Sequence, residues 1–566
     1  MRRMLPALVA ALTFVALAAV PAAANRAKHI DHIVVIYEEN HSFDNLYGGW
    51  EGVDGLGNAD AAHTTQVGQN GTAYTCLMQN DVNLASPPLP ADCSDSTTGS
   101  TFTSHFTNQP FRIDDYIAPT AKTCPAPGVF AAHGVLAPTG LEGGCTEDLV
   151  HRYYQEQYQL DGGKQDRYVT GSDAVGLTMG NYDTKALPVY AYLHGKHHPK
   201  YVIADRFFQS AFGGSFLNHQ WLVAARTPTW PGAPNDGGAN DLHSIVNGDG
   251  MPTSYPLYNG GTGLKDTQLT ASCTPPSGTT PAGVVCGDYA VNTTQPPYQP
   301  YAPGTAATRR LPAQTAPTIG DRLSAKGVDW AWYSGGWSNA DGDVAGPGWT
   351  NGDTPGTCTS TNTAANATYP NCPDKLFQYH HQPLNYYASF APGTPERAEH
   401  LLDEQSFISD AAASKKRGCK LKQVSFIKPL GNENEHPGYA SEPNGSDHLV
   451  DLIQAVETGP QAGNTLIVVT YDEFGGEWDH VSPPGMGSTT GAHDQFGPGT
   501  RVPTLLIGRS FTSSGVDHTV YDTTSIMATI EHQFGLQPVA ARGSVTPRDS
   551  LVNDLANAVS TGRMGR

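Results

Sequence analysis

Charged residues are scarce in this chain, and basic residues are the scarcer kind. Only 15% of the 566 residues are charged, with 33 Lys and Arg against 53 Asp and Glu, so the formal net charge is −20. The low content of charged residues excludes a coiled coil and a charge-rich disordered chain. The negative balance repels phosphate backbones and anionic membrane surfaces, so we expect no nucleic-acid partner.

A long apolar run stands only at the N-terminus of the sequence. Two arginines precede it, it extends from Leu5 to Val20, and alanines follow it. This pattern predicts a secretory signal peptide over residues 1–24. Because the run is shorter than the roughly 20 residues of a membrane span, we expect no stable membrane insertion. The mature chain, 25–566, is then expected to be periplasmic or secreted.

Cys-x-x-Cys motifs are absent, and the irregular spacing of the 9 cysteines disfavours a zinc site. Sequence-local couples account for all but Cys419: they are Cys76 with Cys93, Cys124 with Cys145, Cys273 with Cys286, and Cys358 with Cys372. In an oxidising compartment such couples predict disulfides, although other pairings of these cysteines stay open.

Apolar, β-branched runs that end in polar residues predict buried strands, because continuous Val, Ile and Leu runs suit a sheet covered on both faces. These runs lie at 29–40, 201–208, 328–334, 423–430, 464–474 and 501–508. Helical spacing of apolar residues occurs at 446–459 and 522–535. The order of strands and helices predicts an α/β fold with a mostly parallel central sheet flanked by helices.

Gly, Pro, Ser, Thr and Asn dominate two stretches, at about 50–145 and 228–372, which hold the four cysteine couples. Neither stretch has a run of helices or strands that would form its own core. We therefore predict a single domain over 25–566 with long disulfide-stapled loop insertions. Long loops often carry function, so we expect the insertions to shape the mouth of a site.

Acidic and amide side chains follow two of the predicted strands directly. Glu39 and Asn40 end the first strand, and Asp472 and Glu473 end a later one. Ligands of open α/β sheets sit at the carboxyl ends of the strands, and carboxylate and amide oxygens suit a hard cation. The two glycines at 475–476 permit the bend that lets the later pair converge. Ordinary strand-end polar residues are the alternative interpretation.

A serine stands at the predicted start of a helix, after two glycines. Gly213 and Gly214 lead into Ser215 and the helix-like run that follows it. A hydroxyl in this position lies beside unpaired backbone N–H groups and the positive end of the helix dipole, where a phosphate or an oxyanion is stabilised. A helix N-cap is the alternative. The pattern is not GxSxG, because Leu217 stands two residues after the serine.

Several of the 21 histidines lie in unusual local settings, namely His151, His380, His381, His436 and His480. Imidazoles donate to phosphate oxygens, transfer protons or bind metals, whereas a lone histidine is often structural. The sequence has no HExxH or HxH pattern, which favours phosphate contact or proton transfer over a metal cage.

Glu39-Asn40, GGSFLNHQW, YHHQP, EHP and YDEFGGEWDHV occur in this order. The ordered set resembles the bacterial phosphoesterase family of phospholipases C and related acid phosphatases, over about 29–535. This resemblance implies an alkaline-phosphatase-like core. It also implies that one divalent metal ion, of open identity, lies among the two strand-end pairs, Glu39, Asn40, Asp472 and Glu473.

The resemblance also implies roles for the remaining candidates. Ser215 matches the hydroxyl nucleophile of the family. His151, His380 or His381, and His436 match its phosphate-contacting or proton-transfer histidines. One of the two adjacent histidines is expected to face the site.

The function implied by the resemblance is an exported metal-dependent phosphoesterase acting on a small phosphate ester or a phospholipid headgroup. The phospholipase branch commonly has threonine where Ser215 stands, which favours an acid phosphatase that forms a phosphoserine from phosphomonoesters. A phospholipase C acting on phosphodiesters is an alternative. An exposed aromatic rim would favour it, and the candidates are Trp330, Trp332, Tyr333 and Trp337, for which a place in the core is the equal alternative. A non-catalytic exported binding protein and other phosphate- or sulfate-ester chemistry are the remaining alternatives.

Overall fold

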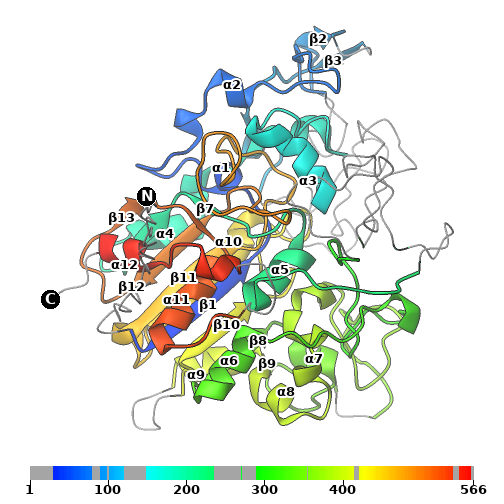
Figure 1. Cartoon of the computed structure of the whole chain (residues 1–566), viewed down its shortest axis with the longest axis vertical. Helices are drawn as coiled ribbons and strands as arrows, with labels where there is room; N and C mark the ends of the chain where they lie inside the picture. The colour runs from blue at the N-terminus through cyan, green and yellow to red at the C-terminus, as the bar shows by residue number, and fades with distance from the viewer. Residues whose placement is uncertain are drawn as a thin grey trace, which may run out of the picture.

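An eight-stranded sheet forms the centre of the molecule (Figure 1). The structure, a computed structural model, describes residues 30–78, 89–97, 101–119, 148–234, 242, 269, 288–352, 355–413, 420–539 and 547–562. The strands of this sheet are β1 (His32–Glu38), β6 (Lys200–Ala204), β8 (Trp330–Ser334), β9 (Leu401–Asp403), β10 (Val424–Lys428), β11 (Thr465–Tyr471), β12 (Thr504–Gly508) and β13 (Gly515–Asp517). Their order is β13-β6-β12-β11-β1-β10-β8-β9. β12 is antiparallel to β11 and β6, and the other described pairings of the sheet are parallel.

The predicted fold class is confirmed, and each predicted run contributes a strand to this sheet. The run at 201–208 is divided, because its last two residues form β7 (Phe207–Phe208), which pairs with β14 (Tyr521–Asp522) in a separate sheet. Every residue of β1 and of β11 is buried, as expected for continuous apolar runs with a covering layer on both faces. The sequence does not predict β9 and β13, which form the two edges of the sheet. Each has only three residues, which is too short for a recognisable pattern.

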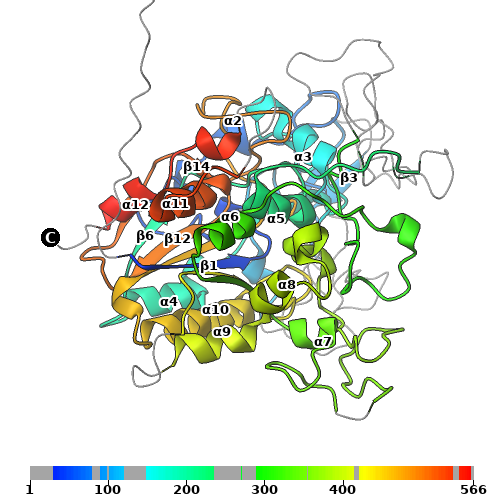
Figure 2. The same ribbon diagram turned by 60° about the horizontal axis from the view of Figure 1, so that its bottom comes forward.

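Helices cover both faces of the sheet (Figure 2). One face carries α5 (Ser215–Ala224), α6 (Ile319–Lys326) and α11 (Thr524–Phe534), and the other carries α4 (Pro188–His194), α9 (Glu404–Ala411) and α10 (Glu442–Glu457). The predicted helices at 446–459 and 522–535 correspond to α10 and α11. α10 begins earlier than predicted because Ser441 caps it, its hydroxyl accepting from the Asn444 N–H at 3.0 Å.

The described chain also contains shorter strands and helices. The further strands are β2 (Cys93–Asp95), β3 (Phe102–Ser104), β4 (Phe111–Arg112), β5 (Gly180–Asn181), β7 (Phe207–Phe208) and β14 (Tyr521–Asp522). The further helices are α1 (Phe43–Leu46), α2 (Ala61–Thr64), α3 (Tyr153–Leu160), α7 (Trp337–Asp341), α8 (Pro395–His400) and α12 (Ala556–Thr561). None of the helices in the described part of the chain has the length and apolar character that a membrane crossing requires.

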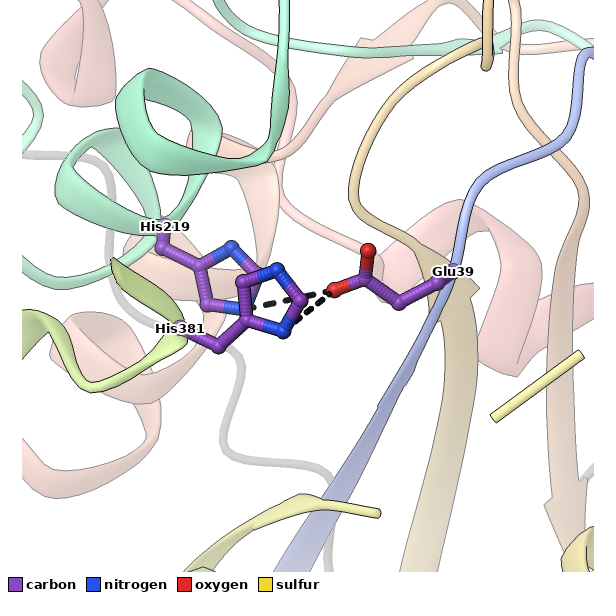
Figure 3. A group of neighbouring side chains, drawn as sticks. All are labelled: Glu39, His219 and His381. Atoms are coloured by element: carbon purple, nitrogen blue, oxygen red, sulfur yellow. Dashed lines mark ion pairs between the residues drawn. The ribbon is translucent and has the colours of Figure 1, made fainter. Parts of the chain in front are cut away.

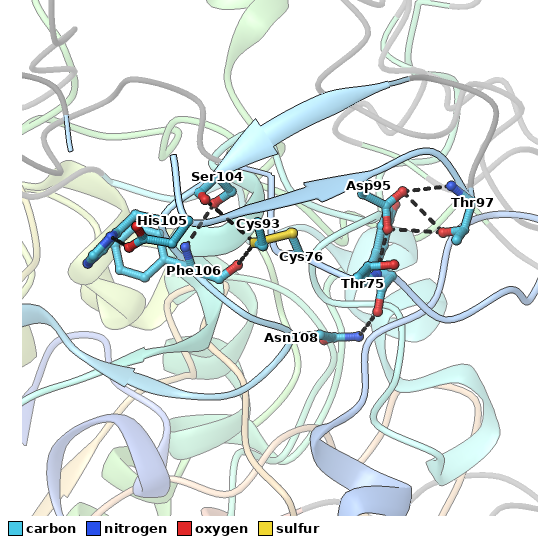
Figure 4. Close-up of a disulfide and its surroundings, with 11 residues drawn as sticks. Thr75, Cys76, Cys93, Asp95, Thr97, Ser104, His105, Phe106 and Asn108 are labelled. Carbon is cyan, nitrogen blue, oxygen red and sulfur yellow. Dashed lines mark hydrogen bonds and ion pairs between the residues drawn. A yellow bond between two sulfur atoms is a disulfide. The ribbon is translucent and has the colours of Figure 1, made fainter. Parts of the chain in front are cut away.

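Two of the predicted disulfides are present, Cys76–Cys93 and Cys358–Cys372. Figure 4 shows the first, which ties the chain around residue 75 to β2. Beside it the Thr75 N–H donates to Asp95 Oδ2 at 2.5 Å. The couples at 124 and 145 and at 273 and 286, and Cys419, lie outside the described residues.

The two loop-rich stretches differ in whether they contribute elements to the central layers. Within 50–145 the described elements are short, such as β2, β3 and β4. Within 228–372, α6 and β8 belong to the central layers, so loop-rich chain lies on either side of them. Trp330, Trp332, Tyr333 and Trp337 are buried in the core, so they form no exposed aromatic rim.

Candidate active site

The two strand-end pairs meet at one edge of the sheet. β1 and β11 are parallel neighbours with Glu38 opposite Tyr471, so the residues after both strands emerge at the same level. The Asp472 N–H donates to the Glu38 carbonyl at 3.2 Å. Asn40 Nδ2 donates to Glu473 Oε1 at 2.8 Å, which joins the two pairs directly. The side chains of all four strand-end residues are buried: Glu39, Asn40, Asp472 and Glu473.

The bend expected after β11 is present. Gly475 and Gly476 have φ angles of +65° and +79°, in the left-handed region that favours glycine. A Cβ on Gly475 would lie 2.2 Å from the Asn40 carbonyl oxygen. The Gly475 N–H donates to Glu473 Oε2 at 2.6 Å. The bend therefore lets the two strand ends pack closely and holds one carboxylate in place.

Ser215 is the first residue of α5, and its hydroxyl faces the acids. Ser215 Oγ lies 3.2 Å from Glu39 Oε2 and 3.3 Å from Glu473 Oε1. Gly214 occupies the N-cap position, and no side chain caps the helix. The N-cap interpretation of Ser215 is therefore wrong. The hydroxyl lies at the helix N-terminus, with carboxylates in hydrogen-bond range.

A buried acid that sequence reasoning missed holds the loop before α5. The Glu156 carboxylate accepts from the N–H groups of Gly213 at 2.5 Å and Thr500 at 2.7 Å. Burial raises the pKa of Glu156 to about 7. Gly213 itself has a φ of +85°, and a Cβ there would lie 2.5 Å from the Tyr153 nitrogen. These contacts fix the direction in which Ser215 enters the site.

The predicted histidines surround the same point. His151 Nε2 lies 3.3 Å from Glu473 Oε1, and His381 Nδ1 lies 3.1 Å from Glu39 Oε1. Of the adjacent pair, His381 makes the carboxylate contact, and the His380 ring packs against it at 4.3 Å. The rings of His436 and His151 are 6.5 Å apart. His480, by contrast, belongs to a separate cluster with Asp44, Asp54 and Arg501.

Sequence reasoning missed two further members of the site, His219 and Lys428. The His219 ring stacks on His381 with 4.8 Å between centroids, and both rings face Glu39 (Figure 3). Lys428 ends β10, and its Nζ lies 2.6 Å from Glu39 Oε1. His219 follows Ser215 by one helical turn, and this i, i+4 spacing was the available signal. For Lys428 the available sequence feature was a basic residue near the end of the predicted strand at 423–430.

Charge in the site is unbalanced. Burial, with mutual repulsion among the carboxylates, raises the pKa of Asp472 well above its usual range, and burial also raises the pKa of Glu39 and Glu473. Burial lowers the pKa of His219 and His381, so neutral rings face these acids. Among the described residues, Lys428 is the Lys or Arg side chain that contacts these acids, and the His151 ring contacts Glu473. The ionised site is therefore short of positive charge.

The donor set fits a divalent cation. Asn40 Oδ1, Asp472 Oδ2 and His219 Nε2 are buried without a hydrogen-bond partner among the described residues. His219 Nδ1 donates to the Ser215 carbonyl at 2.8 Å, which leaves Nε2 as the ring atom with a lone pair. Glu39, His219 and His381 bring ligand atoms within 4.8 Å of one another. Carboxylate, amide and imidazole groups are together typical ligands of Mn²⁺, Fe²⁺ or Zn²⁺.

A cavity of about 340 Å³ opens beside Ser215. Its lining includes His151, which contacts Glu473, and Gly214 and Phe216, which flank Ser215 in the chain, together with Asp148 and Asn292. A substrate group beyond the reacting atom has room there.

The family model for the Phosphoesterase family matches this chain over residues 30–127 and 133–537. The chain belongs to the Phosphoesterase family. This confirms the resemblance seen in the ordered motifs.

Curated relatives match a smaller part of the chain. Non-specific phospholipase C6 of Arabidopsis thaliana is 29% identical over 27% of this chain and 32% of its own length. Non-hemolytic phospholipase C of Pseudomonas aeruginosa is 25% identical over 34% of this chain and 31% of its own length. The alignments thus span about a third of these relatives.

The chain is also similar to solved structures. The lipoteichoic acid synthase LtaP of Listeria monocytogenes gives a TM-score of 0.28 at 10% identity, over 65% of this chain and 69% of that chain. A protein in the alkaline phosphatase superfamily from Vibrio parahaemolyticus gives 0.22 at 13% identity, over 43% and 52%.

We expect Lys428→Met to destabilise the protein, because it leaves the buried Glu39 carboxylate without its counter-charge. Losing one partner of a buried ion pair costs about 3 kcal/mol. Urea unfolding of this variant and of Lys196→Met, an exposed lysine, measures the difference. Equal unfolding free energies for the two variants would contradict the importance of the pair.

We expect Gly475→Ala to destabilise the protein by roughly 2 kcal/mol or more, because alanine is strained at this φ and its Cβ meets Asn40. Gly463→Ala is the matched control, since no atom lies within 4 Å of a Cβ there. Thermal unfolding compares the two, and a neutral Gly475→Ala would mean that the bend tolerates a side chain.

Proposed function

We propose that this chain is an exported, metal-dependent phosphoesterase, and that its main activity is the hydrolysis of phosphomonoesters through a phosphoserine intermediate. The observation that carries the proposal is the Ser215 hydroxyl, which lies at a helix N-terminus within 3.2 Å of Glu39 and 3.3 Å of Glu473. Membership of the Phosphoesterase family supports it. Export rests on the predicted signal peptide over residues 1–24.

Glu39, Asn40, Asp472 and His219 would hold the metal ion. When bound, a divalent cation supplies Lewis-acid polarisation of the phosphoryl oxygens and lowers the pKa of the serine hydroxyl. Lys428 and His381 hold the other oxygen of Glu39, so Glu39 Oε2 stays directed at Ser215.

In the first step Ser215 loses its proton to the facing carboxylate of Glu473, and its oxygen attacks phosphorus. The new O–P bond forms as the bond to the leaving oxygen breaks. The N-terminus of α5 stabilises negative charge on the phosphoryl oxygens. The reacting group is thus held between the helix and the acids.

His151 is suited to protonate the leaving alkoxide. Its Nδ1 donates to the Leu149 carbonyl at 2.5 Å, so Nε2 is the atom available for proton transfer. His151 also lines the cavity beside Ser215, where the leaving group would lie. In the second step the same ring takes a proton from the water that cleaves the phosphoserine. His380, His381 and His436 would contact phosphate oxygens.

Two observations favour phosphomonoesters. The candidate aromatic residues, Trp330, Trp332, Tyr333 and Trp337, are in the core rather than at a rim. Phe216 is the Phe, Tyr or Trp among the described lining residues, and these residues form no cage of rings for a quaternary ammonium headgroup.

A phospholipase C activity is the second candidate. It is favoured by the relatives, which are phospholipases C from Arabidopsis and Pseudomonas. Because the alignments cover about a third of these proteins, we rank this candidate second.

We expect Ser215→Ala to lower phosphatase turnover by about 10⁴-fold or more, because it removes the nucleophile. Circular dichroism should show an unchanged fold, and Ser94→Ala, at an exposed serine, should retain full turnover. Mass spectrometry of acid-quenched wild-type enzyme should find phosphate on Ser215. Turnover near wild type in Ser215→Ala would remove Ser215 as the nucleophile.

We expect the mature protein to hydrolyse p-nitrophenyl phosphate faster than p-nitrophenylphosphorylcholine from about pH 4 to 8, because the described lining of the cavity supplies no aromatic cage. Dialysis against a chelator should abolish turnover, and a single divalent metal should restore it. Faster diester turnover would assign the protein to the phospholipase C candidate. Full activity after complete metal removal would contradict metal dependence.

A further inference from the structure

A second group of metal-ligating side chains lies on the face of the sheet covered by α9 and α10, away from α5 (Figure 2). Glu404 begins α9, Glu433 follows β10, and His448 lies on α10. Ligand atoms of the three side chains lie within 4.8 Å of one another. None of them takes part in the phosphoesterase site proposed above.

The distances in this group suit a shared cation. His448 Nε2 lies 2.9 Å from Glu404 Oε1 and 4.0 Å from Glu433 Oε2. Ligands at about 2.1 Å from a divalent ion lie roughly 3 Å apart when adjacent and roughly 4 Å apart when opposite. Glu404 is buried, while Glu433 is partly exposed, which leaves a way in from solvent.

Buried oxygens around the group lack partners. Glu404 Oε2 has no hydrogen-bond partner among the described residues, and neither does either carboxylate oxygen of Glu38. Both side chains are at most 2% exposed. Such oxygens are costly to bury without a partner, so their presence points to a bound cation.

Glu38 is directed toward this group. The ring of its neighbour, Tyr37, packs against His219 on the α5 side of the sheet. Side chains alternate along a strand, so Glu38 points to the side of α9 and α10. Burial raises the pKa of Glu38 well above its usual range, the charge of Glu435 raises this pKa further, and the charges of Lys428 and His448 lower it. Glu404 also raises the pKa of Glu38.

We propose that Glu404, Glu433 and His448, with Glu38 behind them, bind a second divalent cation, of the Mn²⁺ or Zn²⁺ class. Carboxylates combined with one imidazole favour these ions over Ca²⁺ and Mg²⁺, which prefer oxygen ligands alone. The ion would tie the end of β1 to α9, to α10 and to the segment that carries His436.

A protonated His448 is the competing source of positive charge. Burial alone lowers its pKa, but the hydrogen bond to Glu404 and the charges of Glu404 and Glu433 raise the pKa of His448 to about 9. In that case the group is an ion-pair cluster that binds no metal. A direct count of bound ions distinguishes this cluster from a metal site.

The test is a Mn²⁺ count on the full mature chain. The protein is stripped with a chelator and titrated with Mn²⁺ at pH 7.5, and electron paramagnetic resonance measures the free ion. We expect two bound ions in the wild type, one in Glu433→Gln and one in Asp472→Asn. Glu399→Gln, at an exposed glutamate of α8, should keep both ions. Mn²⁺ should also raise the melting temperature of Asp472→Asn but raise that of an Asp472→Asn/Glu433→Gln double variant far less.

An unchanged Mn²⁺ count in Glu433→Gln would overturn the proposal, as would loss of every ion in Asp472→Asn. His448→Gln provides a second variant with the same expected loss of one ion, should Glu433→Gln fail to fold. Two ions in Asp472→Asn with one in Glu433→Gln would instead refute the metal ligation proposed for the phosphoesterase site, and the second site would stand.

Discussion

The parallel register of β10, β1 and β11 is the constraint on which the site depends. Ile36 lies opposite Ile427, and Glu38 lies opposite Tyr471, so the three central strands end together. Lys428 and the two pairs that follow β1 and β11 therefore lie close together at the carboxyl ends of these strands. A slip of one residue would turn Glu39 to the other face of the sheet, away from Ser215. Because these strands are buried throughout, such a slip would also disrupt the packing of both faces.

The same arrangement places like charges together in a dry interior. Glu39, Asp472 and Glu473 are all buried, and burial raises the pKa of each. Lys428, the Gly475 N–H and the Ser215 hydroxyl offset part of this cost. Burial of whole apolar strands stabilises the folded state and offsets the free-energy cost of burying these carboxylates.

Much of this architecture could be predicted from sequence, since apolar runs, helical spacing and the polar residues that end strands are local patterns. Glu39 and Asp472 were found because they follow such runs directly. Lys428 had one local signal, its place near the end of a predicted strand, and Glu156 had none, since its role depends on contacts between segments far apart in the chain. Loop-rich segments such as 50–145 carry no periodicity, so little of their structure follows from the sequence.

Alternation along one strand links the two faces of the molecule. Glu38 and Glu39 are consecutive and point to opposite sides, so a single strand end supplies a buried acid to each face. Lys428 acts on both, since its charge lowers the pKa of Glu38 and of Glu39 against the effect of burial. One lysine cannot neutralise two carboxylates and their acidic neighbours. Electrostatic interactions add, so positive charge placed on one face also stabilises the ionised carboxylate on the other, and the two groups are coupled through space.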